Sequence, residues 1–104
     1  MQKKARLKDY SGAIADYEKA IEINPNSQTY YNRGRARSTL KDYSGAIADY
    51  TKTIPINPKY LPAYKSRGIV KEIIGNIKGA CSDWEEASSH GDKNANKWLK
   101  EDCS

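Results

Sequence analysis

The stretch LKDYSGAIADY occurs twice in this chain of 104 residues, first at residues 7–17 and again at residues 40–50. The second copy begins 33 residues after the first. In a looser third copy a further 34 residues on, Gly34, Ala46 and Tyr50 are matched by Gly68, Ala80 and Trp84. A unit that recurs at this interval is one small arrangement of secondary structure repeated along the chain. The sequence therefore predicts an array of similar units, in which function usually resides in the surface that stacking creates.

Each unit has the apolar periodicity of amphipathic helices. Between residues 13 and 21 the apolar residues recur every three or four positions, as on a helix that buries one face. The pairs Asn24-Pro25 and Asn57-Pro58 interrupt this pattern. We expect helices at about residues 1–8, 10–23, 28–40, 43–54, 61–74, 77–89 and 92–101.

Two kinds of residue mark the expected helix ends. Asp9 and Asp42 stand where a side chain can cap the first turn of the second helix of a unit. Pro55 has no N–H to donate to the carbonyl of Thr51, so we expect that helix to end or bend near Ile54.

Each unit is thus a helix, a tight turn, a second helix and an Asn-Pro turn, and this pattern resembles the tetratricopeptide repeat along the whole chain. That family follows W-x2-L-G-x2-Y…A-x3-F…A…P over about 34 residues. In the middle unit the matching residues are Tyr30, Gly34, Ala46, Tyr50 and Pro58. In the next unit they are Tyr64, Gly68, Ala80, Trp84 and Ala87. The first unit retains Ala13, Tyr17, Ala20 and Pro25.

The resemblance implies an all-α fold, a right-handed α-solenoid of antiparallel helix pairs with about two and a half repeats and a C-terminal capping helix. We expect one domain over residues 1–104. Its expected parts are a partial first repeat (1–26), a second repeat (27–60), a third repeat (61–91) and the capping helix (92–104). The first repeat is partial because Met1 aligns with Gly34 and Gly68, halfway through a first helix.

Nothing in the chain predicts an enzyme, a cofactor site or a metal site. His90 is the one histidine, and it stands beside Gly91 at an expected helix end rather than next to a nucleophile. The adjacent carboxylates of Glu85 and Glu86 diverge on a helix, so they cannot flank one substrate.

The two cysteines leave two interpretations open. Cys81 occupies an apolar helix position, where a small buried thiol is the simpler interpretation. The alternative is a disulfide with Cys103 that ties a terminal helix back onto the array, which would require an oxidising compartment.

The expected cellular setting is the cytoplasm. No apolar run approaches ~18 residues, so we expect no membrane-spanning segment. The first residues of the chain also lack the apolar core of a secretion signal.

The net charge of +5 is concentrated in the expected first helices. Segments 1–8, 27–41 and 61–75 contain eleven Lys and Arg residues and one acidic residue, Glu72. In the family, first helices line a concave groove that receives an extended or helical segment of a partner. The resemblance therefore implies a moderately basic groove, and we expect a protein or peptide ligand that is acidic.

Part of the basic charge is expected to pair inside the array. Arg33 and Arg67 stand where the family pattern has leucine, while Asp16, Asp49 and Asp83 recur on the second helices. We predict that Asp16 pairs with Arg33, and Asp49 with Arg67, between neighbouring units.

The resemblance places a set of residues in the peptide groove. Tyr31, expected to face outward from a first helix, and Ile69 would be apolar anchors. Asn32 would bond to the ligand backbone, while Arg35 and Lys65 would meet acidic groups. The full expected set is Arg6, Gln28, Tyr31, Asn32, Arg35, Lys65, Ile69, Glu72 and Ile73.

One branch of the family clamps the terminal carboxylate of chaperones with two Lys, two Asn and an Arg. Asn32 matches that clamp, but Pro62 and Ser66 stand where its third-unit Lys and Arg would be. The sequence does not support this clamp.

Two alternatives to peptide binding stay open. One is self-assembly, such as a homodimer, through the incomplete N-terminal repeat. The other is RNA or DNA binding through the basic first helices. Most aromatic residues recur at repeat spacing, in positions that the family uses for packing, so we do not expect nucleic acid to be the partner.

Overall fold

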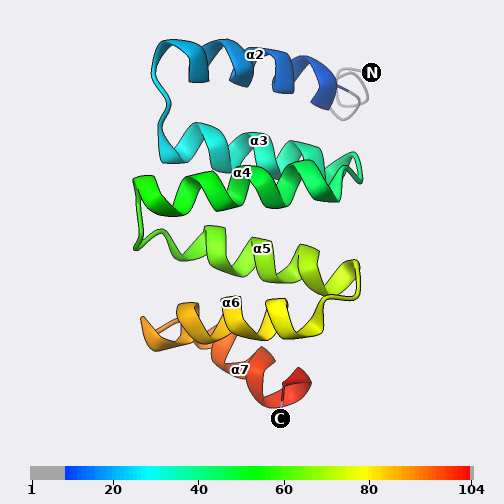
Figure 1. Ribbon diagram of the computed structural model, residues 1–104, viewed down its shortest axis with the longest axis vertical. Helices are drawn as coiled ribbons and strands as arrows, with labels where there is room; N and C mark the ends of the chain where they lie inside the picture. The colour runs from blue at the N-terminus through cyan, green and yellow to red at the C-terminus, as the bar shows by residue number, and fades with distance from the viewer. Residues whose placement is uncertain (1–8, 104) are drawn as a thin grey trace, which may run out of the picture.

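The computed structural model describes residues 9–103 as six α-helices that follow one another in a single stack (Figure 1). They are α2 (Tyr10–Ile23), α3 (Ser27–Thr39), α4 (Tyr43–Ile56), α5 (Leu61–Ile73), α6 (Ile77–Ser89) and α7 (Lys93–Asp102). No strand occurs in this described range, and the all-α prediction is confirmed. The helix expected at residues 1–8 lies outside the described residues. None of the described helices is long and apolar enough to cross a membrane.

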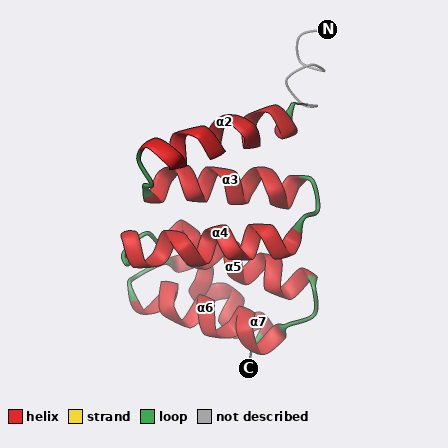
Figure 2. Cartoon of the chain, turned by 45° about the horizontal axis from the view of Figure 1, so that its top comes forward, coloured by secondary structure: helices red, strands yellow, loops and turns green. Residues whose placement is uncertain are grey.

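Successive helices run in opposite directions and each packs against the next (Figures 1 and 2). Two complete hairpins result, α3 with α4 and α5 with α6, flanked by α2 at one end and by α7 at the other. The leading helices α3 and α5 also touch each other. The molecule is elongated, with extents of 43 × 30 × 21 Å, as expected for an α-solenoid.

An aromatic side chain packed against a glycine joins the two helices of each hairpin. A Cβ atom added to Gly34 would lie 2.6 Å from Cε1 of Tyr50, and one added to Gly68 would lie 2.4 Å from Nε1 of Trp84. Both aromatic residues are 2% exposed. Since neither position has room for a side chain, the recurring glycines are required for this close approach of helices.

Both predicted residues occupy N-cap positions, but of the two only Asp42 makes a capping hydrogen bond. Asp42 precedes α4, and its carboxylate accepts a hydrogen bond from the backbone N–H of Gly45 at 3.1 Å. Asp9 holds the same position before α2 but makes no such bond. A third acidic cap, Asp92, accepts from the N–H of Ala95 at 2.9 Å and begins α7.

The helix does not end near Ile54, one of the two outcomes expected for Pro55, because α4 continues through Pro55 to Ile56. Pro55 is exposed and lies in the last turn, where it removes one backbone hydrogen bond. The N–H of Asn57 donates to the carbonyl of Thr53 at 3.0 Å, so helical hydrogen bonding resumes after the proline. Water can satisfy the one carbonyl left without a partner at an exposed helix end.

The interpretation of Cys81 as a buried thiol was also wrong, because Cys81 forms a disulfide with Cys103. The Cα atoms of the two residues are 5.9 Å apart. Helix α7 folds back along α6, with Trp98 packed 5.4 Å from Trp84 between ring centroids, and this brings Cys103 to Cys81. Disulfides persist in oxidising surroundings and are rare in the cytoplasm. The disulfide therefore does not support the expected cytoplasmic location, which stays a prediction.

We expect this disulfide to stabilise the folded chain. It closes a loop of 22 residues, and restricting that loop in the unfolded state is worth about 3 kcal/mol in a chain-entropy model. The double variant C81S/C103S should lose about that much free energy of unfolding in a urea titration. Reductant should destabilise the native chain and leave the double variant unchanged. Equal stability of the native chain with and without reductant would contradict this account.

Candidate functional site

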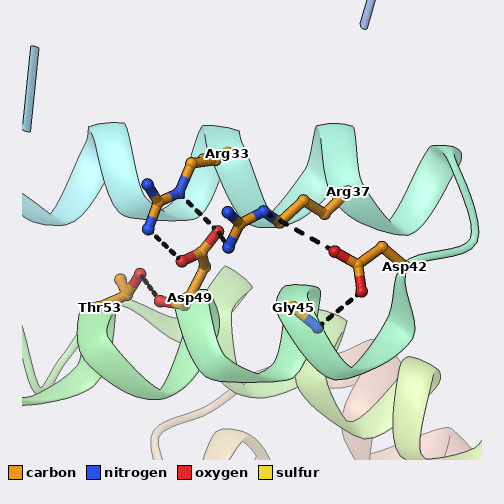
Figure 3. A network of polar contacts seen from close by, with 6 residues as sticks. All are labelled: Arg33, Arg37, Asp42, Gly45, Asp49 and Thr53. Carbon is orange, nitrogen blue, oxygen red and sulfur yellow. Dashed lines mark hydrogen bonds and ion pairs between the residues drawn. The ribbon is translucent and has the colours of Figure 1, made fainter. Parts of the chain in front are cut away.

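A buried carboxylate on the second helix of a hairpin pairs with two arginines of the first helix. In the hairpin of α3 and α4, Nε of Arg33 donates to Oδ2 of Asp49 at 2.9 Å and Nη2 donates to Oδ1 at 2.8 Å (Figure 3). Arg37 adds a third bond to the same carboxylate at 3.2 Å. Asp49 is 1% exposed, and its hydrogen bonds raise the pKa of Arg33 against the opposing effect of burial.

The next hairpin repeats the arrangement. Nε and Nη2 of Arg67 donate to the two carboxylate oxygens of Asp83 at 2.9 and 2.7 Å. The ammonium of Lys71 lies 3.3 Å from Oδ2 of the same residue. Four cations are thus held by the two acids and cannot serve an incoming ligand without exposing a buried carboxylate.

The predicted pairing of Asp16 with Arg33, and of Asp49 with Arg67, was wrong. Arg33 pairs with Asp49 and Arg67 pairs with Asp83. Each pair forms within its own hairpin and joins residues 16 apart in the chain. Asp16 is exposed. The reason is geometric: the two helices of a hairpin are antiparallel, so residues equally distant from the connecting turn face each other. Arg33 and Asp49 each lie eight residues from Lys41, which is in the turn.

The expected groove residues occupy the two leading helices, which touch each other. Gln28, Tyr31, Asn32 and Arg35 belong to α3, whereas Lys65, Ile69, Glu72 and Ile73 belong to α5. Arg6 lies outside the described residues. Arg35 and Ile69 line a common hollow of about 170 Å³ between α3 and α5. Ile69 and Ile73 are one helical turn apart on α5 and are 39% and 55% exposed.

Tyr31 does not face outward as expected. It is half-buried, with its ring centroid 5.5 Å from that of Tyr50 and 5.2 Å from that of Tyr60. Its hydroxyl lies 3.0 Å from the hydroxyl of Ser66 on α5. Tyr31 therefore joins two neighbouring repeats, and a ligand would meet part of its ring rather than a free side chain.

Gln28 and Asn32 are linked along the same face of α3. The amide of Gln28 donates to Oδ1 of Asn32 at 3.0 Å, and the hydroxyl of Tyr60 donates to Oε1 of Gln28 at 3.0 Å. This chain of bonds orients the side-chain amide of Asn32, whose NH₂ group remains available to donate.

Lys65 is engaged by a residue that sequence reasoning did not connect with the groove. Its ammonium lies 3.0 Å from Oδ2 of Asp92, the residue that caps α7. Burial of Asp92 opposes its ionisation, but the bond from the N–H of Ala95 and the contact with Lys65 outweigh it and lower the pKa of Asp92. The capping role of Asp92 was readable from sequence spacing, whereas its partner on α5 was not.

Among the expected groove residues that the structure describes, Arg35 is the cation left without an ion pair. It is exposed, and its guanidinium forms no hydrogen bond or ion pair with another of residues 9–103. It stands between the hollow shared with Ile69 and a second hollow of about 280 Å³, lined in part by Tyr10, Tyr17 and Asn32. The part of the chain that the structure describes has no group of three His, Cys, Asp or Glu residues that could hold a metal ion.

A family model, curated proteins and solved structures all match this chain. The family model described as "Tetratricopeptide repeat" matches residues 4–27 and 27–60. Human serine/threonine-protein phosphatase 5 is 36% identical over 81 residues, and its rat counterpart is 34% identical over the same length. These matches cover 77% of this chain and 16% of each phosphatase, so the chain spans less than a fifth of the length of these relatives.

Three solved structures are similar over nearly the whole chain. The first TPR of Spaghetti (RPAP3), bound to the HSP90 peptide SRMEEVD, has a TM-score of 0.83 and 25% identity, covering 96% of this chain and 82% of that one. The Arabidopsis OM64 TPR domain has a TM-score of 0.82 and 29% identity, covering 96% and 85%. The second TPR domain of human RPAP3, in complex with the HSP70 peptide SGPTIEEVD, has a TM-score of 0.81 and 26% identity, covering 91% and 82%.

We expect the buried carboxylates to be necessary for the fold that presents these side chains. Asp49→Asn should lower the free energy of unfolding by about 3 kcal/mol, because it leaves Arg33 without an ionised partner at a buried site, while Arg37 keeps only the exposed Asp42 at 3.9 Å. The equivalent exposed residue gives a matched control, and Asp16→Asn should change stability by less than about 0.5 kcal/mol. Urea unfolding followed by circular dichroism measures both. Equal effects of the two substitutions would contradict this assignment.

Proposed function

Because this chain belongs to the tetratricopeptide repeat family, we propose that it is a non-catalytic module that binds a peptide segment of another protein in the groove of α3 and α5. The observation that carries the proposal is the hollow shared by the two leading helices, where the exposed Arg35 stands beside Ile69. Two similar domains are described as bound to peptides, SRMEEVD and SGPTIEEVD, and both peptides contain adjacent acidic residues.

The groove offers a ligand three kinds of contact. Arg35 would pair with an acidic side chain, and its open position means that no internal ion pair with another of residues 9–103 must break first. Ile69 and Ile73 would cover an apolar side chain, because both are partly exposed on one face of α5. Asn32 would donate to a ligand carbonyl, with its orientation held by Gln28.

The remaining members of the expected set have smaller roles in this proposal. Lys65 would attract acidic groups less than its charge suggests, because Asp92 already neutralises part of its charge. Glu72 would disfavour an acidic residue at its end of α5. Tyr31 would contribute part of its ring, since its hydroxyl is committed to Ser66. Arg6 stays an expectation outside the described residues.

Nucleic-acid binding loses support from the ion pairs. Arg33, Arg37, Arg67 and Lys71 supply much of the basic charge of the leading helices, and each is directed at a buried aspartate. A polyanion would meet Arg35 and a half-neutralised Lys65 rather than a continuous basic stripe. Self-assembly stays a second hypothesis, which sedimentation over a range of concentrations would test.

We expect Arg35→Glu to weaken the binding of fluorescein-labelled SRMEEVD at least tenfold in fluorescence anisotropy, since it removes a charge-assisted hydrogen bond and adds repulsion. Lys97→Glu, at an exposed position of α7 that lines neither hollow beside Arg35, makes the same change in net charge and should change the dissociation constant less than about twofold. Both variants should keep the helical circular dichroism signal. Equal weakening by the two variants, or none by Arg35→Glu, would overturn the groove assignment.

The ligand's terminal carboxylate should matter little. Two positions of the known carboxylate clamp are Pro62 and Ser66 here, so amidating the C-terminus of the peptide should weaken binding less than about threefold. Replacing its two glutamates by glutamine should weaken binding about tenfold, because the contact with Arg35 is lost. A larger effect of amidation than of the glutamine substitutions would show that the terminus is the group recognised.

Asp92→Asn should tighten binding of the same peptide. Asparagine caps helices about as well as aspartate, so α7 keeps its first turn while Lys65 regains a free charge. An ion pair that still touches solvent, as this partly buried one does, is worth about 1 kcal/mol, which sets the expected gain at about two- to fivefold. Unchanged affinity in anisotropy would mean that Lys65 does not face the ligand.

A further inference from the structure

The hollow between α3 and α5 has an unusual lining for an interface between helices. Its walls are made by one cation, four hydroxyl-bearing residues and two aliphatic residues, and none of the lining residues is acidic. The polar lining consists of Arg35, Ser38 and Thr39 from α3, Tyr50 from α4 and Ser66 from α5. Ile69 and Val70 supply the aliphatic part.

Several of these hydroxyls can donate to a ligand. Ser66 and Tyr31 share one hydrogen bond between their hydroxyls, at 3.0 Å, so one of the two protons stays available. Ser38 makes no side-chain hydrogen bond with another of residues 9–103 and is half-buried beside Arg35. Burial, with a smaller effect of Tyr31, raises the pKa of Tyr50, so its phenol keeps its proton at neutral pH.

The charge of the hollow suits an anion with a single negative charge. A guanidinium presents parallel N–H groups that match the two oxygens of a carboxylate. A phosphate monoester carries about −1.5 to −2 charges at neutral pH, which one arginine does not balance. Ile69 and Val70 provide an apolar surface for the methylene groups that precede the carboxylate of a glutamate.

We propose that this hollow is a carboxylate pocket, in which Arg35 pairs with the anion while the hydroxyls of Ser38 and Ser66 donate to it. The proposal rests on the proposed function where the carboxylate belongs to a bound peptide. It adds which atoms recognise the acidic group, and it gives Ser38 and Ser66 a direct role in recognition, which the peptide contacts described above do not include. The carboxylate can come from a glutamate side chain or from a chain terminus, and the pocket chemistry is the same for both.

The serines give the first test. Ser38→Ala and Ser66→Ala should each weaken binding of fluorescein-labelled SRMEEVD about three- to tenfold in fluorescence anisotropy, the usual effect of one hydrogen bond to a charged group. Ser44→Ala, an exposed serine on α4, is the matched control and should bind like the native chain. Ser66→Ala also removes the bond to Tyr31, so Ser38→Ala, which breaks no bond to another described residue, decides the outcome if Ser66→Ala unfolds.

Small anions test the pocket without any peptide. Sodium acetate should shift the backbone amide resonances of Ser38, Ser66 and Ile69 more than sodium chloride or sodium phosphate of equal ionic strength, in ¹H–¹⁵N correlation spectra. Arg35→Gln should abolish the difference between acetate and chloride. Amidated and glutamine-substituted peptides then distinguish a terminal carboxylate from a side-chain carboxylate as the natural source.

The outcomes separate this proposal from the proposed function. If the peptide binds through Arg35 but neither serine variant changes its affinity and acetate acts like chloride, the carboxylate pocket is refuted while the peptide groove stands. If the peptide fails to bind while acetate still shifts these resonances, the pocket stands without a peptide function. Stronger shifts with phosphate than with acetate would refute the choice of a carboxylate.

Discussion

The fold depends on the contact between an aromatic ring and a glycine backbone in each hairpin. Tyr50 packs on Gly34, and Trp84 packs on Gly68, at distances that leave no room for even a methyl group. This contact sets how closely the leading and trailing helices of a hairpin approach, and thereby how the leading helices α3 and α5 lie beside each other. The arrangement of α3 and α5 therefore depends on the buried glycine–aromatic contacts within each hairpin.

The buried aspartates determine which cations can act. Without Asp49 and Asp83, the leading helices would present a broad basic surface suited to many polyanions. With them, four of the six cations on α3 and α5 are held inside the hairpins, and Arg35 is left beside hydroxyl groups and aliphatic side chains. In the proposed function, one open cation among the described groove residues favours recognition of a particular acidic side chain over attraction to negative charge in general.

The sequence predicted helix positions well because periodicity and capping are local properties. The bounds of α2 and α6 agree with the expected ranges, and Asp42 caps α4 as its spacing indicated. Contacts between helices were predicted less well, because a repeat pattern gives the face on which a residue lies but not its partner. The pairs Arg33–Asp49 and Lys65–Asp92, and the disulfide of Cys81, all required knowing how neighbouring helices are placed.

The ion pairs also bear on how such a chain can lengthen or shorten. Because Arg33 closes on Asp49, and Arg67 on Asp83, each hairpin neutralises its own interior acid. Had the pairs spanned two hairpins, every gain or loss of a unit would have stranded a charge at the break. A hairpin that pairs its own buried acid can be copied by gene duplication without leaving that acid unpaired. The identical eleven-residue stretches at 7–17 and 40–50 are what recent duplication of such a block would leave behind.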